Sequence, residues 1–382
     1  MKTIALITVH RTLNYGTMLQ TYACNSVFRK ENAKMLLIDY YRNKDLQEKD
    51  LSGICEYYKY RKSQGCIKGI KSSSICLLKT ILSYTDTRQF WKHCCAFLNE
   101  TAEMTRSYYS VDELMADPPD ADVFCSGSDQ IWNSDYNGKI DEAYLLSFVP
   151  CGKNKISLAS SIGKDCIDND EKKVMKTFIS QYSFVSVREN QAAEILKEIG
   201  ISAMSIVDPT LLIDSKEWDE IADIRMIKTP YLLIYKLKGD NTLDEVAYRI
   251  AREKGLKIVR ITFSKLVRKK GETTVCLPSV PGFLSLIQNA EYIVTNSFHG
   301  VCFSINFGRQ FTAVSREKYN SRINNILKCL GLSDRLYTGL DNRSADGNID
   351  YHEVMKKLSN EREKAYQWIR QSINTDIDER NE

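Results

Sequence analysis

His299 stands between a short β-branched run and an apolar run, in the stretch VTNSFHGVCFSINFG that covers residues 294–308. The first run predicts a strand, and the second predicts a helix that begins at or beside the histidine. A helix N-terminus lowers the pKa of a histidine, which favours a neutral ring able to exchange protons near pH 7. A histidine that is simply satisfied at a helix start fits the same pattern, so this stretch alone leaves both roles open.

Two earlier stretches carry polar side chains at the end of a predicted strand. Asn14 and Gly16 lie in HRTLNYGT just before a helix start, where free backbone N–H groups and the helix dipole favour an anion. In SGSDQIWN, Ser128 can bind phosphate or sugar oxygens, and Asp129 can accept from a sugar hydroxyl or from a reacting one. An exposed Trp132 would stack on a pyranose face. An ordinary turn, a helix N-cap and a core tryptophan are the structural alternatives.

Three more residues extend this set. Arg188 ends the predicted strand of SVRE, and its planar fork suits a carboxylate or a phosphate, unless it pairs with Glu189 or another acid. Ser297 lies two residues before the histidine, and Arg322 lies in NSRINNIL near a predicted helix start. Together, these junctions predict a cleft rich in anion-binding and proton-transfer groups.

The elements that must position these residues follow a regular order. Strand-like runs such as TIALITV and MLLIDYY alternate with loops and helical patterns, which is the signature of a parallel sheet covered by helices. A second series begins after MIKTP with YLLIYKL. We therefore predict an α/β protein with two Rossmann-like parallel-sheet domains facing a cleft, residues 1–227 and 228–345, and an amphipathic helix over 350–378. Such sheets bind ligands at the carboxyl ends of their strands.

A basic segment interrupts the first domain at about residues 46–103. Its cations, among them Lys59, Arg61 and Lys62, face almost no acids and have tyrosines and leucines between them. One hypothesis is a helical insertion that rests on an anionic membrane surface carrying a lipid-linked acceptor. The alternative is a solvated basic cap that packs its aromatic side chains on the sheet. No run approaches the roughly eighteen apolar residues of a spanning helix, and MKTIALITVH is too short for a signal sequence.

Composition argues against several other classes of protein. The chain has 53 Lys and Arg against 49 Asp and Glu, and this net charge of +4 gives no support to nucleic-acid binding. Its 12 cysteines form no CxxC pair, which predicts reduced thiols of a cytoplasmic protein and neither a disulfide frame nor a zinc site. Dinucleotide-binding GxGxxG, P-loop, HExxH and GxSxG motifs are absent. We expect no metal, no cofactor and no nucleic-acid partner.

In their order along the chain, the motifs resemble the polysaccharide pyruvyl transferase family. The resemblance spans about residues 4–335 and rests on HRTLNYGTMLQTYA, GSDQIWN, SVRE, VDPTLLI, AEYIVTNSFHGVCFSINFGRQF and NSRINNIL. It implies a fold similar to that of glycosyltransferase-B enzymes. It also implies transfer of pyruvate from phosphoenolpyruvate, as a ketal, onto a sugar of a cell-surface glycan or exopolysaccharide or its lipid-linked precursor. The enzyme would be cytoplasmic, with peripheral contact to the inner membrane surface.

The resemblance also implies roles for single residues. His299 would donate a proton or stabilise the departing phosphate, and Arg188 would bind phosphoenolpyruvate. Family members carry an Arg-Leu-His pattern where this chain has Ser297, Phe298 and His299. Either Arg322 or Arg316 would replace the missing guanidinium from the following loop, or the members that carry GSDQIW use a different donor. The acceptor side would be lined by Asn14, Gly16, Asp129 and Trp132.

Two other functions fit the same cleft. One is a glycosyltransferase that uses a nucleotide sugar. The other is a non-catalytic, glycan-binding relative in which the change at Ser297 marks a lost activity.

Overall fold

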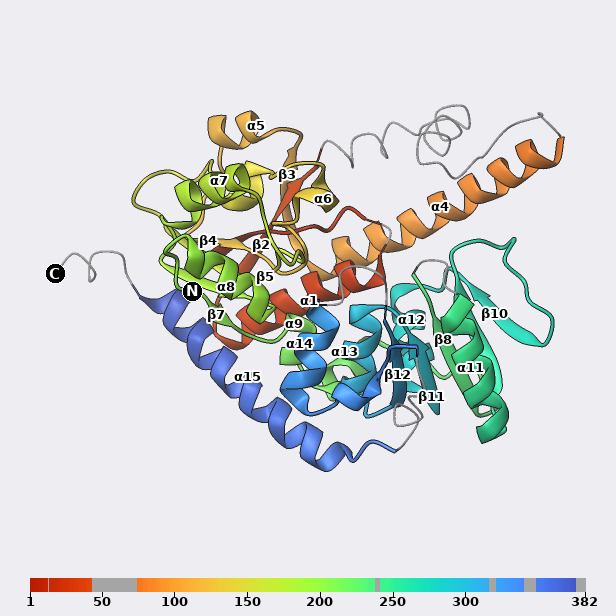
Figure 1. Cartoon of the computed structure of the whole chain (residues 1–382). Helices are drawn as coiled ribbons and strands as arrows, with labels where there is room; N and C mark the ends of the chain where they lie inside the picture. Colours follow the sequence, from red (N-terminus) through yellow and green to blue (C-terminus); the bar gives the residue numbers. More distant parts are fainter. Residues whose placement is uncertain (13, 43–73, 238–240, 316–320, 340–347, 376–382) are drawn as a thin grey trace.

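Two parallel β-sheets form the centre of the computed structural model, which describes residues 1–12, 14–42, 74–237, 241–315, 321–339 and 348–375 (Figure 1). The first sheet has seven strands in the order β3-β2-β1-β4-β5-β6-β7, and the second has six in the order β10-β9-β8-β11-β12-β13. All pairings between neighbouring strands are parallel.

Both sheets have the strand order of a Rossmann fold, 3-2-1-4-5-6, with one strand added to the first sheet. The predicted fold class, two Rossmann-like sheets of the glycosyltransferase-B type, is therefore confirmed. The first sheet consists of β1 (Thr3–Ile7), β2 (Lys34–Tyr40), β3 (Glu103–Tyr108), β4 (Val123–Ser126), β5 (Asn154–Ser160), β6 (Phe184–Val187) and β7 (Met204–Ser205). The second consists of β8 (Tyr231–Tyr235), β9 (Lys257–Thr262), β10 (Glu272–Cys276), β11 (Tyr292–Thr295), β12 (Gln310–Val314) and β13 (Leu336–Tyr337).

The strand order reverses between β1 and β4 in the first sheet and between β8 and β11 in the second. Loops that leave the carboxyl ends of these strands diverge, and such points are where open α/β sheets bind ligands. The polar stretches around Asn14, Ser128 and Ser297 follow β1, β4 and β11 respectively. We call the two places where the strand order reverses the switch points. The topology thus brings three separate stretches of sequence to them.

Helices cover both faces of each sheet, as the buried apolar strands require. In the first half they are α1 (Tyr15–Lys30), α4 (Ser74–Thr101), α5 (Val111–Ala116), α6 (Ser134–Asn137), α7 (Asn169–Ile179), α8 (Asn190–Glu198), α9 (Pro209–Leu212) and α10 (Ser215–Ile221). In the second half they are α11 (Asn241–Lys254), α12 (Val280–Gln288), α13 (Phe298–Asn306), α14 (Ser321–Leu330) and α15 (Tyr351–Asn374). Helix α8 ends at Glu198, and Gly200 follows its C-cap with a φ of 84°, a conformation that glycine adopts without strain.

An aromatic contact joins the two halves of the chain. The ring of Tyr15, the first residue of α1, stacks on Phe283 of α12 with a centroid distance of 4.4 Å and an interplanar angle of 4°. The Tyr15 hydroxyl donates to the carbonyl oxygen of Pro278 at 2.7 Å. Both side chains are fully buried and belong to one apolar cluster with strands and helices of both sheets. The start of α1 is therefore held against the second sheet's layer of helices.

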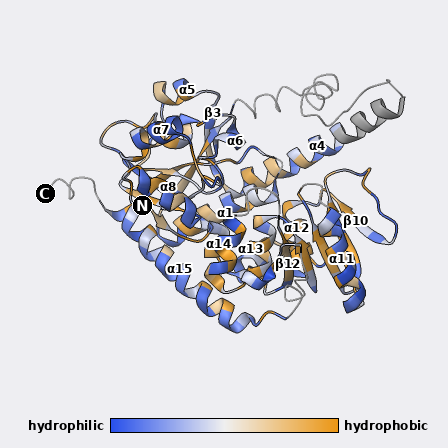
Figure 2. Cartoon of the chain, in the orientation of Figure 1, coloured by the Kyte–Doolittle hydropathy of each residue, from blue (hydrophilic) through white to orange (hydrophobic). Residues whose placement is uncertain are grey.

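Helix α15 returns from the second half of the chain to the first (Figure 1). Its outer face is largely hydrophilic, whereas Leu358, Ala365 and Ile369 are buried (Figure 2). Near its end, Asn154 of β5 donates to the carbonyl of Ser372 at 3.2 Å. The amphipathic pattern noted in the sequence thus corresponds to a helix that packs along both halves.

Only part of the basic insertion lies within the described residues. Helix α4 is described as backbone from Ser74 and with its side chains from Tyr84 onward, while the cations at 59–71 lie outside the described residues. Asp86 of α4 is fully buried and contacts the second half of the chain, where it accepts from the backbone N–H of Lys265 at 2.9 Å. Within the described part of the chain, no helix is both long and apolar enough to span a bilayer. The predicted membrane contact remains a prediction.

We predict that Arg362→Ala lowers the free energy of unfolding by about 2–3 kcal/mol, because charged donors contribute roughly 1.5–3 kcal/mol per hydrogen bond. Arg362 of α15 donates to the carbonyls of Leu211 at 2.6 Å and Ile213 at 3.0 Å, and to Oδ1 of Asn306 at 2.8 Å. Chemical denaturation would measure the change. Glu363→Ala, an exposed neighbour on the same helix, serves as the control. Equal stability of the two variants would contradict the prediction.

Candidate active site

Five titratable side chains meet between the two sheets. They are 1–8% exposed and come from five separate segments of the chain. Because a buried charge is costly unless it is paired, each must be balanced by its neighbours. The cluster consists of Asp129 after β4, Arg188 after β6, Asp208 after β7, His299 at the start of α13 and Arg322 at the start of α14.

The Arg188 guanidinium is at the centre of this cluster. Its Nη1 donates to Oδ2 of Asp208 at 2.7 Å, and its Nη2 donates to Oδ1 of Asp129 at 3.4 Å. Its Nε is buried and has no hydrogen-bond partner among the described residues. Two carboxylates therefore fix the guanidinium and leave one N–H group without an acceptor.

The alternative role of Arg188, a structural pair with Glu189 or another acid, is confirmed for Asp208 and Asp129 and is wrong for a hydrogen bond to Glu189. The Glu189 carboxylate instead accepts from the hydroxyl of Ser161 at 2.9 Å and from the backbone N–H groups of Ile162 at 3.1 Å and Gly163 at 2.9 Å. This acid therefore stabilises the loop after β5. It also occupies the backbone donors of that loop, which makes them unavailable to a ligand.

Asp208 is the member of the cluster that the sequence did not single out. Its Oδ2 accepts from Arg188 and, at 3.0 Å, from the Ser128 hydroxyl, while its Oδ1 accepts from Thr210 N at 2.9 Å and Thr210 Oγ1 at 2.6 Å. Burial raises the pKa of Asp208, but the charge of Arg188 and the hydrogen bonds outweigh burial and hold the pKa at about 2. The Asp-Pro pair that follows β7 looks in the sequence like a simple helix cap, and Asp208 does cap α9.

His299 belongs to the second half of the chain but lies against the first. A Cβ atom on Gly16 of α1 would overlap the His299 ring at Nδ1 and Cγ, so only glycine permits this contact. On the other side, Nε2 lies 4.0 Å from Oδ2 of Asp208 and has no hydrogen-bond partner among the described residues. Burial lowers the pKa of His299, Asp208 and Asp129 raise it, and the net shift is downward. The ring is therefore neutral at pH 7.

Asp129 is held in a strained backbone conformation. Its φ is 80°, in the left-handed region that few residues other than glycine adopt. Its carboxylate accepts from Thr17 Oγ1 at 3.1 Å and from the N–H of Gln130 at 2.8 Å as well as from Arg188. Burial raises the pKa of Asp129, but the lowering by Arg188, His299 and Arg322 is larger. The pKa therefore falls below its usual value. The carboxylate is thus ionised and largely occupied.

The ring of Phe298 lies beside two guanidinium groups, those of Arg188 and Arg322. The Cζ atoms of Arg188 and Arg322 lie 4.6 and 5.5 Å from the centroid of its ring, distances at which a cation is attracted to an aromatic face. The charge of Arg322 acts on Asp129 and His299, whose pKa values it lowers. The two arginines and two aspartates give the cluster no net charge while the histidine is neutral.

Other predicted site residues have structural roles beside the cluster. Asn14 is the N-cap of α1, and its Oδ1 accepts from the N–H of Gly16 at 3.0 Å. Ser297 is the N-cap of α13, and its Oγ accepts from the N–H of Gly300 at 3.3 Å. The first turns of these two helices contain no acidic side chain. Both helix N-termini therefore add positive potential to the site.

Trp132 does not form an open stacking surface, and this prediction is corrected. Its side chain is 1% exposed, and its indole N–H donates to the carbonyl of Tyr144 at 3.0 Å. Its ring also packs edge-on against Tyr182 at 6.4 Å. The tryptophan belongs to the core of the first sheet because its polar N–H finds a backbone acceptor there.

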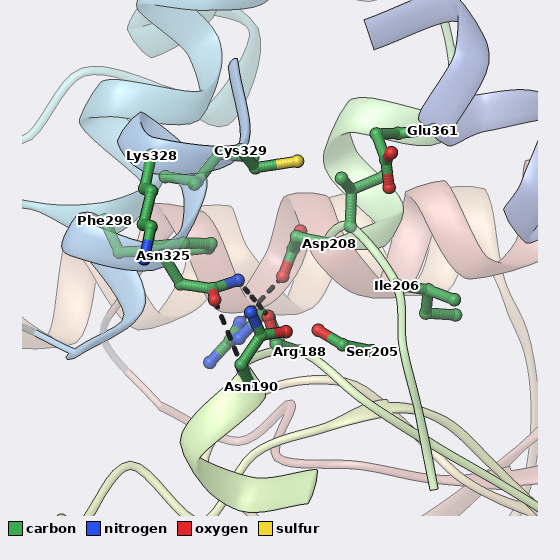
Figure 3. A pocket seen from close by; sticks show the side chains of 12 residues that line it. Arg188, Asn190, Ser205, Ile206, Asp208, Phe298, Asn325, Lys328, Cys329 and Glu361 are labelled. Carbon is green, nitrogen blue, oxygen red and sulfur yellow. Dashed lines mark hydrogen bonds and ion pairs between the residues drawn. The ribbon is translucent and has the colours of Figure 1, made fainter. Parts of the chain in front are cut away.

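A pocket of about 360 Å³ opens on the cluster (Figure 3). Arg188, Asp208 and Phe298 contribute to its lining, and segments from both halves of the chain surround it. Among the described residues, no group of three or more His, Cys, Asp and Glu side chains is placed to hold a metal ion. The pocket therefore offers the guanidinium of Arg188 and the carboxylate of Asp208 to a ligand, and His299 lies in the cluster behind them.

Two Rossmann-like sheets with a buried, charged cluster and a pocket between them define the class of two-domain α/β proteins with a ligand site between the sheets. Residues 14–318 match the family model described as polysaccharide pyruvyl transferase. The chain therefore belongs to the polysaccharide pyruvyl transferase family, and the resemblance noted in its motifs is confirmed. This range includes all the predicted site residues except Arg322.

Comparison with solved structures finds similar folds at low identity. The S. aureus MnaA structure with UDP has a TM-score of 0.48 at 11% identity, over 97% of this chain and 91% of that one. The UDP-N-acetylglucosamine 2-epimerase from Rickettsia bellii has a TM-score of 0.47 at 12% identity, over 97% and 98%. The wall teichoic acid polymerase TagF has a TM-score of 0.47 at 14% identity, over 100% and 90%. No curated protein sequence matches the chain.

We predict that Gly16→Ala moves the His299 ring. Alanine is favoured over glycine in a helix by about 1 kcal/mol, so a disturbance would come from the overlap of the new Cβ with the ring. The side-chain ¹H–¹⁵N NMR signals of His299 should shift, while those of exposed His352 should not. The chain has four histidines, and His299→Gln would assign the signal. An unchanged His299 signal would contradict the contact.

We predict that Asp208→Asn lowers the pKa of His299 further, because it removes a negative charge 4.0 Å from Nε2. NMR titration would give both values. In the native protein the midpoint should lie below the usual value of about 6.5. The unfolded chain then takes up this proton at a higher pH than the folded protein, so His299 reduces stability as pH falls through that interval. A native midpoint above the usual value would contradict the prediction.

Proposed function

We propose that the protein transfers pyruvate from phosphoenolpyruvate, as a ketal, onto a sugar of a polysaccharide or of its lipid-linked precursor. The observation that carries this proposal is the pair of buried Nε atoms, on Arg188 and His299, that have no partner among the described residues. Buried polar groups in proteins are nearly always satisfied, so two such atoms at the carboxyl ends of parallel strands point to a ligand site. Membership of the family supports phosphoenolpyruvate as that ligand.

The site provides what an anionic donor needs. Arg188 offers its Nε–H, and Arg322 adds a second guanidinium, which suits the planar carboxylate and the phosphate of phosphoenolpyruvate. The N-termini of α1 and α13 converge at the contact between Gly16 and His299 and add to the positive potential. We propose that Arg322 replaces the guanidinium that the family pattern carries at the position of Ser297.

The proposed reaction requires one proton donor and the removal of two hydroxyl protons. One sugar hydroxyl adds to C2 of phosphoenolpyruvate while C3 gains a proton and becomes a methyl group. The bond between C2 and the phosphate oxygen then breaks, and the second hydroxyl adds to C2 to close the ketal. Two hydroxyl protons are released in total. One matches the proton taken up at C3, and the other leaves with phosphate.

His299 is the group we assign to proton transfer. It is neutral without ligand, and an incoming phosphate or carboxylate would raise its pKa by adding negative charge beside it. Asp208, 4.0 Å from Nε2, would then stabilise the protonated ring. Asp129 was predicted to accept a proton as well. We assign it instead to holding Arg188, because its carboxylate is already occupied and its pKa is low.

The proposal predicts phosphate release that depends on both phosphoenolpyruvate and an acceptor sugar. His299→Gln should lower the rate by about 100- to 10,000-fold, the usual contribution of a general acid or base, with the melting temperature unchanged. His352→Gln is the matched control, since His352 is exposed on α15. Arg322→Met should weaken phosphoenolpyruvate binding by about tenfold or more, since one charged contact is worth about 1.5–3 kcal/mol.

Two results would reject the proposal. Full activity of His299→Gln would remove the assigned proton donor. Thermal stabilisation of the protein by UDP or GDP, but not by phosphoenolpyruvate, would indicate a nucleotide-sugar glycosyltransferase.

A further inference from the structure

The pocket beside the cluster extends well beyond the groups assigned to the donor. Arg188 and Asp208 line it next to the cluster, and this part is called the floor. The rest of its lining, called the upper pocket, comes from the start of α8, the residues around β7, and α13, α14 and α15 (Figure 3). Its volume of about 360 Å³ lies within the range of roughly 300–1,000 Å³ that small-molecule sites occupy. The groups assigned to the donor are Arg188, Arg322 and His299, none of which belongs to the upper pocket, so its residues are left for a second molecule.

The walls of the upper pocket combine apolar and uncharged polar groups. Phe298, Ile206 and Ile326 provide apolar surface, and Asn190, Asn325 and Ser205 provide amides and a hydroxyl. An asparagine side chain both donates and accepts, and a serine hydroxyl does the same, which matches the alternating needs of sugar hydroxyls. Apolar walls with a few convergent polar groups are the usual composition of a small-molecule site.

The charges around the pocket cancel. Arg188 and Asp208 pair at the floor at 2.7 Å. At the rim, Lys328 and Glu361 carry opposite charges, and Glu361 also pairs with Lys364 at 2.7 Å. A second anion would gain little from such a surface. A neutral ligand with many hydroxyls suits it better.

Asn325 is placed to exchange its present contacts for a ligand. Its Oδ1 accepts from the N–H of Asn190 at 3.3 Å, and its Nδ2 donates to the carbonyl of Arg188 at 3.4 Å. Both distances exceed the usual 2.7–3.2 Å of such hydrogen bonds, which indicates weak contacts. This side chain also connects α14 of the second half with the first half, where it contacts the end of β6 and the start of α8.

We propose that this upper pocket binds a neutral pyranose ring of the acceptor, with Asn325 as a hydrogen-bonding residue that selects it. That this sugar is the acceptor rests on the proposed function. Binding of the sugar itself does not require the transfer reaction.

Cys329 provides a direct test in the native protein, because its exposed thiol lines the pocket. Exposed Cys151 and Cys166 do not line it and serve as internal controls. Iodoacetamide labelling of each thiol would be followed by peptide mass spectrometry with methyl glucoside, methyl galactoside, methyl mannoside or glycerol added. We expect at least one hexoside, but not glycerol, to slow labelling of Cys329 alone. Equal labelling with every hexoside, or protection by phosphoenolpyruvate but by no hexoside, would overturn the proposal.

A pair of neighbouring asparagines on α14 provides the second test. Asn325→Ala should abolish the protection of Cys329 and raise the acceptor KM by about three- to tenfold, the value of one or two hydrogen bonds, with the donor KM unchanged. Asn324→Ala, at an exposed position on the same helix, should do neither. If Asn325→Ala changes neither protection nor KM in an active transferase, this inference fails and the proposed function stands. If hexosides protect Cys329 but phosphoenolpyruvate is never consumed, the proposed function fails and the sugar pocket stands.

Discussion

The pairing of Arg188 with Asp208 and Asp129 is the interaction on which the rest of the site depends. A guanidinium that is 3% exposed could not remain charged in the core without these two carboxylates. Each carboxylate is in turn fixed by the backbone, Asp208 as the cap of α9 and Asp129 in a left-handed turn after β4. The charged core of the site is thus built by loops at the ends of β4, β6 and β7, and the parallel sheet determines their spacing.

The second half of the chain completes this core and brings its net charge to zero. His299 enters as a neutral ring, and Arg322 brings a guanidinium that balances the second aspartate. The apolar contact between Tyr15 and Phe283 holds the start of α1 where the histidine meets it. Interactions that stabilise the fold and interactions that prepare the site are therefore adjacent in the structure, and α15 ties both halves together from the outside.

Much of this organisation can be predicted from the sequence. Each strand of a parallel sheet appears as an apolar run followed by a polar junction and then by a helical pattern, and this series recurs in order. The junctions at Asn14, Asp129, Arg188 and His299 were found in this way. Asp208 was not, since it follows a strand of two residues and its Asp-Pro pair is typical of a helix cap. The orientation of Trp132 was predicted wrongly because it depends on Tyr144 and Tyr182, which the chain brings together only after folding.

The contact between Gly16 and His299 constrains how the two halves of the chain can evolve, in addition to its role in the site. Each half has its own sheet, and a chimera of two relatives could keep its fold if the apolar cluster shared by the halves were matched. Its site would nevertheless be lost if the half that supplies α1 carried any side chain at the position of Gly16, because that atom would occupy the space of the imidazole. The two halves must therefore change together at this one point, although their sheets are free to diverge.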